Sequence, residues 1–553
     1  MITSPFPDKS AQPPILSVER LSLSYRHVDG WRQVVNDVSF TVGTGEVVAL
    51  VGESGSGKTT IAQAVIGLLP ENGRIDAGAI RLNGTDISGW SDRRLDAIRG
   101  QAISLVPQDP GSSLNPVLTI GAQVGEILRL HGVRDRIERR DLVLGLLSRV
   151  GLSQPELRAD QYPHQLSGGM KQRVLIAIAI ALRPALIIAD EPTSALDVTV
   201  QRRILDLIDE LRTEFGTSVL LVTHDLGVAA DRADRIVVLK QGRIQEQGAK
   251  ARLLAYPENT YTQQLLRDAP STATTAFRSI KRVSATSITV ESLTQDFMVA
   301  GKPFRAVDDI SFTIAQGTTH ALVGESGSGK TTTARSVAGF QHPTAGRVTI
   351  NGTDITALKG EALRSFRRDV QLVYQNPFAS LDPLQTVGQI IAEPLLNFER
   401  VAKVERGERV AAMLDKVGLA AEMLDRSPRA LSGGQRQRVA IARALILEPS
   451  VLVLDEAVSA LDVTVQAQVL RLLDGLQQQL GLTYLFVTHD LAVVRLLAHT
   501  VTVMQGGKVV ESGSVADVFN RPTQQYTRDL IAAIPGQHAQ PANAISTYGR
   551  AAE

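Results

Sequence analysis

Two segments of the chain have the residue types and spacing of a phosphate-binding loop. Gly52–Thr59 and Gly324–Thr331 both read Gly-Glu-Ser-Gly-Ser-Gly-Lys-Thr, and they follow the apolar runs Val47–Val51 and Thr319–Val323. Glycines at this spacing let backbone N–H groups surround phosphate oxygens, and a helix that begins there adds the positive end of its dipole. The pattern predicts nucleotide binding by Ser54, Gly55, Ser56, Gly57, Lys58, Thr59 and Thr60, and by Ser326, Gly327, Ser328, Gly329, Lys330, Thr331 and Thr332.

The lysine and the first threonine of each loop have separate roles in this chemistry. We expect Lys58 and Lys330 to reach the β- and γ-phosphates. We expect the hydroxyls of Thr59 and Thr331 to ligate Mg²⁺. A glycine turn that binds nothing could produce one such match by chance, but two matches in register, each after an apolar strand, favour two nucleotide sites.

Two further apolar runs end in paired carboxylates. Asp190-Glu191 follows Leu186–Ala189, and Asp455-Glu456 follows Val451–Leu454. Side chains at the carboxyl end of a parallel strand face the ligand crevice. The aspartates suit a Mg²⁺ shell, and the glutamates suit a group that orients or deprotonates an attacking water. Such a pair alone also fits a solvated loop, and the phosphate-binding loop upstream favours the site.

A second possible anion cradle occurs in each half of the chain. Ser167, Gly168 and Gly169 precede one long helical segment, and Ser432, Gly433 and Gly434 precede another. A serine at this position could simply cap its helix. It could also present a helix N-terminus to an anion. One nucleotide has no need of two cradles from one domain, so the second cradle makes sense if it serves a nucleotide held by the other half.

All these features occur twice in the same order. The separation between Lys58 and Lys330 is nearly the same as that between His224 and His489. So small a difference between the two separations, over a whole domain, indicates an internal repeat. Within each half, apolar runs such as Val219–Val222 alternate with helical stretches. This alternation predicts two α/β domains, each with a mostly parallel core sheet covered by helices.

Length and composition agree with two domains. The 553 residues exceed what one hydrophobic core supports, and we place the domains at 15–271 and 288–536. Between them, 272–287 is rich in Ser, Thr and Ala and predicts a flexible linker, while 537–553 predicts a disordered tail. A net charge of +1 argues against nucleic acid as the main partner. The absence of cysteine excludes disulfides and thiolate metal sites.

No segment of the sequence predicts a secretory signal or a membrane span. The N-terminal segment before Ile15 contains no apolar run. The most apolar stretch, Val174–Ala189, is interrupted by Arg183-Pro184. We expect a helix over Val174–Leu182 and a buried strand over Ala185–Ala189, each too short to cross a bilayer.

The ordered set of motifs resembles the ATP-binding domain of ABC transporters over nearly the whole chain. Leu166–Met170 and Leu431–Gln435 resemble the family signature, and Ser194–Asp197 and Ser459–Asp462 resemble its D-loop. The resemblance implies P-loop NTPase domains with a helical subdomain, ATP and Mg²⁺ as ligands, and two ATPs sandwiched head to tail. It also assigns roles to further residues: Gln108 and Gln375 to the Q-loop beside nucleotide and Mg²⁺, His224 and His489 to the catalytic switch position, and Tyr25 and Phe297 to stacking on adenine.

Finer matches point to one subfamily. Pro107–Pro110, Gln375–Pro377 and the segments beginning at Tyr261 and Tyr526 resemble the ATPases of peptide and nickel importers. The first half resembles their D-type subunit and the second their F-type subunit, so the chain is similar to a fusion of the two. This implies two transmembrane permease subunits and an extracytoplasmic binding protein as partners, with the chain peripheral on the cytoplasmic face of the membrane. The cargo stays open among dipeptides, oligopeptides, glutathione and nickel.

Two departures from the family pattern accompany this resemblance. Ala457 replaces the proline that Pro192 preserves in the first half, and Ile178 replaces the arginine found at Arg443. Neither change removes a catalytic group, so we expect both sites to hydrolyse ATP. Some relatives carry an iron–sulfur cluster, which a chain without cysteine cannot ligate.

A different class remains as the alternative, a soluble ABC ATPase that acts on ribosomes or DNA. Relatives that act on ribosomes have a long charged helical linker, and those that repair DNA have cysteine-bound zinc. The linker here is short and rich in Ser and Thr, and cysteine is absent. Both features favour the importer.

Overall fold

The computed structural model describes residues 13–194, 196–270, 277–278, 285–299, 301–459 and 461–536, apart from the side chain of residue 378. Its contacts divide the chain into two compact units, one built mainly from the first repeat and the other mainly from the second. The predicted tail, 537–553, and most of the predicted linker, 272–287, lie outside the described residues.

The core of the first repeat is a six-stranded sheet of order β10-β9-β3-β8-β7-β6. All neighbouring strands in it are parallel except β10, which is antiparallel to β9. Every residue of β3, β7 and β8 is buried, which explains why these strands are apolar runs in the sequence. The strands are β3 (Val47–Val51), β6 (Ile103–Val106), β7 (Leu186–Asp190), β8 (Ser218–Thr223), β9 (Arg235–Lys240) and β10 (Arg243–Ala249).

A second, antiparallel sheet in this repeat was not predicted from the sequence. Its order is β2-β1-β4-β5, with β1 at Leu16–His27, β2 at Gly30–Val42, β4 at Gly73–Leu82 and β5 at Thr85–Asp86. Buried side chains of this sheet share one apolar core with β3 and with the first helix. The helix that follows the phosphate-binding loop therefore packs into a core to which both sheets contribute.

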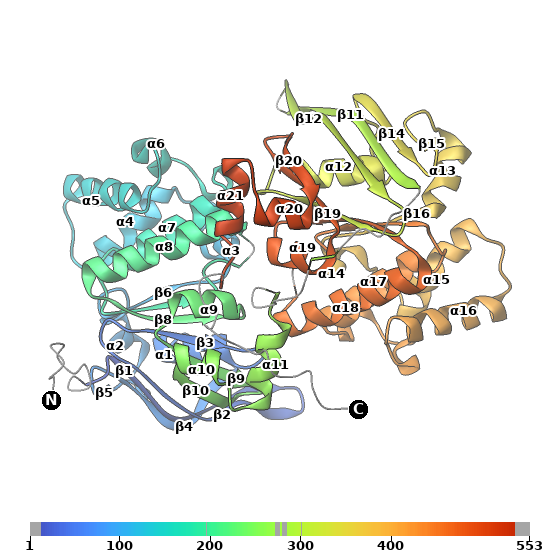
Figure 1. Ribbon diagram of the computed structural model, residues 1–553. Helices are drawn as coiled ribbons and strands as arrows, with labels where there is room; N and C mark the ends of the chain where they lie inside the picture. The colour runs from blue at the N-terminus through green and yellow to red at the C-terminus, as the bar shows by residue number, and fades with distance from the viewer. Residues whose placement is uncertain are drawn as a thin grey trace, which may run out of the picture. The chain divides into compact units, whose positions relative to one another are not determined.

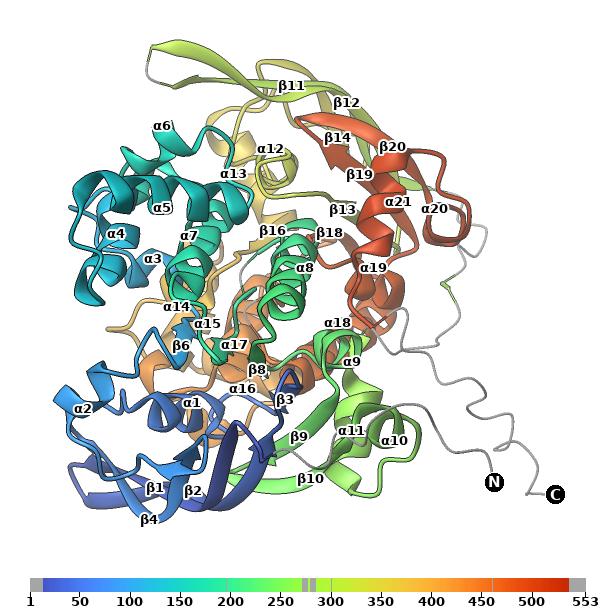
Figure 2. The ribbon, with the colours of Figure 1, turned by 90° about the vertical axis from the view of Figure 1, so that its left-hand side faces the viewer.

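Helices of the first repeat cover the core sheet and form a separate subdomain. Figures 1 and 2 show α4, α5 and α6 at one end of this repeat and the antiparallel sheet at the other. The predicted helix over Val174–Leu182 overlaps the later part of α7, which begins earlier, at Gly168, and ends at Ile180. The helices are α1 (Lys58–Ile66), α2 (Asp92–Asp96), α3 (Pro110–Ser113), α4 (Ile120–Leu130), α5 (Arg136–Arg149), α6 (Pro155–Ala159), α7 (Gly168–Ile180), α8 (Val198–Phe215), α9 (Leu226–Arg232), α10 (Lys250–Ala255) and α11 (Thr260–Asp268).

The second repeat has the same architecture, with sheets of order β20-β19-β13-β18-β17-β16 and β12-β11-β14-β15. Its strands are β11 (Thr286–Val299), β12 (Lys302–Ala315), β13 (Thr319–Val323), β14 (Ala345–Ile350), β15 (Thr353–Asp354), β16 (Val370–Val373), β17 (Val451–Asp455), β18 (Thr483–Thr488), β19 (Thr500–Gln505) and β20 (Lys508–Ser514). Its helices are α12 (Lys330–Val337), α13 (Gly360–Asp369), α14 (Pro377–Ser380), α15 (Val387–Phe398), α16 (Lys403–Lys416), α17 (Gly433–Leu445), α18 (Val463–Leu480), α19 (Leu491–Leu497), α20 (Val515–Asn520) and α21 (Gln525–Ala532). The two-domain α/β prediction is confirmed.

Two residues of the predicted linker are anchored on the second unit. Phe277 packs against the apolar cluster around α20 and α21, with its ring centroid 6.0 Å from that of Phe519. The guanidinium of Arg278 lies 2.7 Å from the carboxylate of Asp474 and also donates to the carbonyl of Leu496. These contacts offset part of the entropy that ordering this stretch costs.

The cores of the two repeats differ at one position of the central strand. His320 of β13 stands where β3 has Val48, and it is 2% exposed. Its ring stacks on Phe312, and its Nδ1 lies 2.8 Å from the hydroxyl of Thr500. Burial lowers the pKa of His320 to about 3, so the imidazole is neutral in the folded protein.

Candidate nucleotide-binding sites

Each phosphate-binding loop lies between a buried strand and a helix whose first residue is the lysine. A Cβ on Gly52 would lie 2.1 Å from the carbonyl oxygen of Leu239, so only glycine allows this close passage of the chain. The Nζ of Lys58 donates to the carbonyls of Gly52 and Glu53, at 2.8 and 2.9 Å. The same contacts occur at Lys330, at 2.8 and 2.7 Å. The ammonium group of each lysine is thus held against the backbone of its own phosphate-binding loop.

The loops fit a phosphate chemically. In the first loop the hydroxyl oxygen of Ser56 is buried and has no hydrogen-bond partner among the described residues. A buried polar atom of this kind is costly to leave unpaired, and a phosphate oxygen would satisfy it. The loop N–H groups and the N-terminus of α1 add positive potential at the same place.

A threonine and an aspartate meet beside each loop, as the pattern predicts for a Mg²⁺ site. The hydroxyl of Thr59 donates to the carboxylate of Asp190 at 3.1 Å, and that of Thr331 donates to Asp455 at 3.0 Å. Burial raises the pKa of Asp190 to about 6 and shifts the pKa of Asp455 in the same direction. A carboxylate that is costly to ionise alone is well placed to bind a cation. The donor set of hydroxyl and carboxylate oxygens suits Mg²⁺.

The glutamate after each aspartate has a strained backbone. Glu191 has φ of +44° and Glu456 has φ of +48°, in the left-handed region that few non-glycine residues adopt. The backbone N–H of Glu191 donates to the carbonyl of Val222 at 2.8 Å, which fixes this conformation. Backbone strain at the same position in both repeats indicates that the placement of this glutamate is needed for function.

Two side chains hold the carboxylate of each glutamate. Nδ1 of His224 lies 3.2 Å from Oε1 of Glu191, and the amide of Gln108 donates to Oε2 at 2.9 Å. In the second repeat the His489–Glu456 distance is 3.4 Å, and Gln375 donates to Glu456 at 2.7 Å. The structure therefore brings together side chains from three loops far apart in the sequence.

Electrostatics within this cluster favour an ion pair between glutamate and histidine. Burial opposes ionisation of Glu191, but the hydrogen bond and the charge of His224 outweigh it and lower the pKa of Glu191. Burial likewise disfavours the imidazolium of His224, and Glu191 outweighs it and raises the pKa of the histidine. The same directions hold for Glu456 and His489. The carboxylate is thus kept ionised, as a group that orients or deprotonates water must be.

The two aromatic residues expected to stack on adenine differ in their surroundings. The hydroxyl of Tyr25 donates to that of Thr60 at 3.4 Å, so Tyr25 lies beside the helix that follows the loop. Phe297 lies opposite Phe304 in the β11–β12 pair and is 37% exposed. Adenine stacking by either ring stays a prediction.

The serines of the predicted second cradle cap their helices. The hydroxyl of Ser167 accepts from the N–H of Met170 at 3.4 Å, and that of Ser432 accepts from Gln435 at 3.3 Å. The second glycine of each motif has a packing reason, because a Cβ on Gly169 would lie 2.6 Å from Val200. Ser167 and Gly168 are exposed, so the helix start stays accessible to an anion.

One tyrosine per repeat contacts the phosphate-binding loop, and sequence reasoning gave it no role. The hydroxyl of Tyr261 in α11 accepts from the backbone N–H of Glu53 at 3.3 Å. The hydroxyl of Tyr526 in α21 accepts from the N–H of Glu325 at 3.1 Å. The two tyrosines have the same separation in the sequence as the two switch histidines, so the repeat spacing was the signal that could have found them.

Comparison with known proteins identifies the family. The family model described as ABC transporter matches residues 35–194 and 307–459, which include both loops and both Asp-Glu pairs. The chain belongs to the ABC transporter family. It contains two ABC ATPase domains, each of which binds ATP, in a single chain.

Several curated ABC transporter ATPases are similar over nearly their whole length. The peptidoglycan transport ATP-binding protein YejF of Agrobacterium fabrum is 44% identical over 96% of this chain and 98% of its own. The glutathione import ATP-binding protein GsiA of Salmonella paratyphi A is 40% identical over 96% and 91%. The oligopeptide transport ATP-binding protein OppD of Mycobacterium bovis is 41% identical over 94% and 98%. Among the described residues, no helix is long and apolar enough to cross a membrane.

Proposed function

We propose that the chain hydrolyses ATP at two sites to power the import of peptides through partner permease subunits. The observation that carries this proposal is the duplicated cluster in which Gln108 and His224 hold the carboxylate of Glu191, repeated at Glu456. Such a cluster beside a phosphate-binding loop supports hydrolysis by an oriented water. The transport names of the similar ATPases support coupling to import.

The residues of each site have distinct proposed roles. Lys58 leaves its carbonyl partners to bind the β- and γ-phosphates, while Glu191 accepts a hydrogen bond from the attacking water. His224 keeps Glu191 ionised and oriented. When bound, Mg²⁺ would neutralise charge on the phosphates, and Thr59 and Asp190 would hold it. Lys330, Glu456, His489, Thr331 and Asp455 have the same roles in the second repeat.

A head-to-tail arrangement completes each site in this proposal. Ser432 and its glycines would bind the γ-phosphate of the nucleotide held by Lys58, and Ser167 would do so for Lys330. The support is chemical: each domain has two anion cradles, and one nucleotide needs only one from each domain. Closure of the sandwich on ATP and its opening after hydrolysis would drive the permeases.

The partners and location follow from this function. The chain would bind two transmembrane permease subunits at the cytoplasmic face of the membrane, and an extracytoplasmic binding protein would deliver the cargo. Vesicles that contain the permeases and the chain should hydrolyse ATP faster when cargo-loaded binding protein is added. Stimulation by ribosomes or DNA instead would favour the alternative class of soluble ABC ATPase.

The cargo is proposed to be a peptide, with glutathione as the specific alternative. Two of the similar proteins are named for oligopeptide and glutathione transport, and glutathione is itself a tripeptide. Uptake of labelled dipeptide, oligopeptide, glutathione and nickel by one strain, with and without the chain, separates these cargoes. Loss of nickel uptake alone would contradict the peptide proposal.

A further inference from the structure

The chain that follows the Q-loop glutamine is held differently in the two repeats. It runs over residues 108–119 and 375–386, and we call these two stretches the Q-loop segments. Each begins at the glutamine that donates to the glutamate of its nucleotide site. Each ends at the threonine that caps the next long helix, α4 or α15. Because the two segments have equal length, their contacts can be compared position by position.

In the first repeat, Gln123 of α4 holds the Q-loop segment with three hydrogen bonds. Its Oε1 accepts from the N–H of Asn115 at 2.8 Å. Its Nε2 donates to the carbonyls of Asn115 and Leu118, at 3.1 and 3.0 Å. One side chain thus pairs three backbone groups of an irregular stretch. The equivalent residue of α15 is Ile390, which is buried and can form none of these hydrogen bonds.

In the second repeat, the segment is held by α17, the signature helix that Ser432 caps. The guanidinium of Arg443 in this helix donates to the carbonyl of Ser380 at 2.6 Å. The equivalent residue of α7 is Ile178. In the part of the first repeat that the structure describes, no side chain of α7 donates a hydrogen bond to the Q-loop segment. The second repeat therefore has a direct tie that the first repeat lacks.

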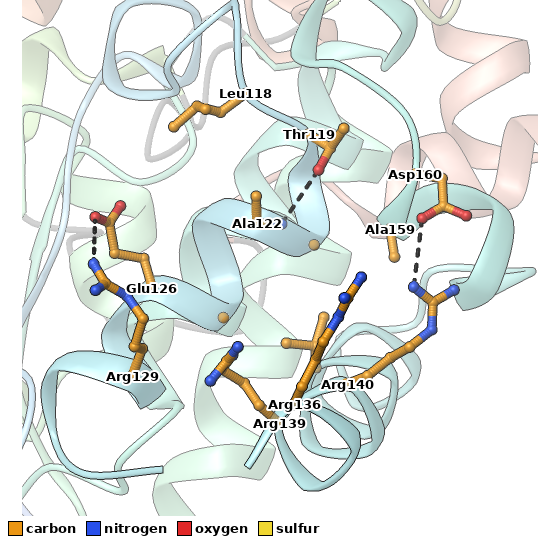
Figure 3. Close-up of a pocket in the computed structure, with 13 residues that line it drawn as sticks. Leu118, Thr119, Ala122, Glu126, Arg129, Arg136, Arg139, Arg140, Ala159 and Asp160 are labelled. Carbon is orange, nitrogen blue, oxygen red and sulfur yellow. Dashed lines mark hydrogen bonds and ion pairs between the residues drawn. The ribbon is translucent and has the colours of Figure 1, made fainter. Parts of the chain in front are cut away.

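The charges around one carboxylate follow the same division. In the first repeat, Glu126 of α4 has its cation on its own helix, where Arg129 lies 3.7 Å away. Figure 3 shows this pair on α4. Both residues line a cavity of about 480 Å³ between α4 and α5, in which the small side chain of Ala159 leaves space. The charge of Arg129 is thus paired within α4.

Glu393 of α15 is the equivalent carboxylate in the second repeat, and its surroundings differ. Leu396 stands at the position of the arginine in α4, so α15 supplies no cation there. Burial lowers the pKa of Arg443, and the charge of Glu393 opposes that shift, so the two groups attract each other. The cation beside this carboxylate therefore comes from α4 in the first repeat and from the signature helix in the second.

The contact of Arg443 connects two groups that serve nucleotide chemistry. Ser380 follows Gln375 by five residues, and Gln375 donates to Glu456 at 2.7 Å. Arg443 follows Ser432 by eleven residues along one helix, a distance of about 16 Å. Because a helix of this length moves as a unit, a displacement of the Q-loop segment also displaces the start of α17. In the first repeat, the hydrogen bonds of the Q-loop segment lead to α4 instead.

We propose that Arg443 is a positioning residue that joins the Q-loop segment to the signature helix in the second repeat, whereas Gln123 joins the first Q-loop segment to α4. A change at the nucleotide that moves Gln375 then also moves the anion cradle at Ser432. The corresponding change at Gln108 moves α4, and the start of α7 is not tied to it. The two ATP sites are therefore not equivalent, although their loop and carboxylate residues are the same. This inference rests on the proposed function, because it takes ATP hydrolysis as the reaction.

Double-mutant cycles on ATP turnover by the full chain test this pairing. Arg443→Ile and Gln123→Ile each install the residue of the other repeat. Each should lower kcat about fivefold, as the loss of a hydrogen-bonded contact predicts, with KM for ATP within about twofold. Arg443→Ile with Gln375→Ala should be little worse than Gln375→Ala alone, because the arginine acts through the segment that begins at this glutamine. With Gln108→Ala, the two effects of Arg443→Ile and the glutamine change should multiply.

The first repeat provides the mirror-image cycle. Gln123→Ile should be non-additive with Gln108→Ala, and its effect should multiply with that of Gln375→Ala. Arg438→Ile is the matched control in α17, because this arginine donates to the carbonyl of Val417 and not to the Q-loop segment. Its effect, whatever its size, should multiply with that of Gln375→Ala, as expected for a residue with a purely structural role.

Further variants separate positioning from loss of the fold. Arg443→Lys keeps one donor that can reach the carbonyl of Ser380, so it should restore most of the lost turnover. Thermal unfolding reports whether each variant is folded. If Arg443→Ile does not fold, Arg443→Met, which is neutral but long and flexible, takes its place in the cycles.

Two results would overturn the proposal. One is that the effects of Arg443→Ile and Gln375→Ala multiply, which would give Arg443 a role unrelated to the Q-loop segment. The other is that Arg443→Ile is equally non-additive with both glutamines, which would show no difference between the repeats. A folded wild-type chain without ATP turnover would contradict the proposed function instead.

Discussion

The hydroxyl of Tyr261 accepts a hydrogen bond from the backbone N–H of Glu53, the second residue of the phosphate-binding loop. The carbonyl of Gly52, which belongs to the same peptide unit as that N–H, accepts from the ammonium of Lys58. The final helix of the domain thus positions the peptide unit against which the phosphate-binding lysine rests. The carboxylate of Glu246 holds that helix in place through the N–H groups of residues 258 and 259. The second repeat repeats this relationship at Tyr526.

We expect Tyr261→Phe with Tyr526→Phe to weaken ATP binding about fivefold, with a smaller change in kcat. Each substitution removes one hydrogen bond, worth about 1 kcal/mol, from a loop that contacts phosphate. Fluorescent nucleotide titration and steady-state kinetics measure the two effects separately. Tyr256→Phe, at an exposed tyrosine of the same region, is the control. Unchanged affinity in the double variant would show that the contact does not position the loop.

Glu191→Gln with Glu456→Gln should lower kcat at least ~100-fold while ATP stays bound. The amide keeps the shape of the side chain but cannot accept a proton, and it loses the ion pair with histidine. ATP turnover and the amount of nucleotide retained per chain are the measurements. Turnover near that of the wild-type chain would remove these glutamates from the mechanism.

The Mg²⁺ assignment predicts a specific change in metal dependence. Thr59→Val with Thr331→Val should raise the Mg²⁺ concentration for half-maximal turnover by about tenfold, because each site loses one oxygen ligand. Turnover is titrated with Mg²⁺ at saturating nucleotide. Thr60→Val, at the next residue of α1, should leave the Mg²⁺ titration at saturating nucleotide unchanged. An identical titration for the double variant and the wild-type chain would contradict the assignment.

The buried His320 predicts acid sensitivity of the second domain. Its folded-state pKa of about 3 lies below the usual value of 6.5, so the unfolded chain binds the proton first as pH falls. Stability is therefore full above about pH 6.5 and decreases by roughly 1.4 kcal/mol per pH unit between there and the folded-state pKa of about 3. His320→Val, which installs the residue of β3, should remove this loss.

Calorimetry at pH 7 and pH 5 measures the effect. Both tryptophans, Trp31 and Trp90, lie in the first repeat. Unfolding of the second domain is therefore the transition that leaves tryptophan fluorescence unchanged. The midpoint temperature of this transition should be lower at pH 5 than at pH 7 in the wild-type chain. In the variant the difference between the two pH values should be much smaller. An equal fall in both would assign the acid sensitivity to other groups.

Most of the correct sequence-based predictions of the fold came from local residue patterns. The runs Val47–Val51 and Thr319–Val323 are β3 and β13 as expected, because strands buried on both faces must be continuously apolar. The antiparallel sheets were missed, since their strands are only partly buried and lack that pattern. Contacts between distant loops, such as Tyr261 with Glu53, depend on the completed fold and have no local signature.

A residue-by-residue comparison of the two repeats would have predicted further differences between them. The replacement of Val48 by His320 and of Arg129 by Leu396 is visible in the sequence once the two halves are aligned. What that alignment could not supply is the space beside Ala159, which depends on how α4, α5 and α6 pack.

Two composite ATP sites within one chain are tested most directly by pairing a loop lysine with each signature serine. We predict that Lys58→Ala with Ser432→Arg is little worse in ATP turnover than Lys58→Ala alone, because both changes damage one site. Lys58→Ala with Ser167→Arg should be much worse, because each site then loses a group. ATP occupancy is measured beside turnover, since coupling between the sites could let one lesion silence both. If Lys58 is instead non-additive with Ser167, each domain builds its own complete site, and the head-to-tail proposal is wrong.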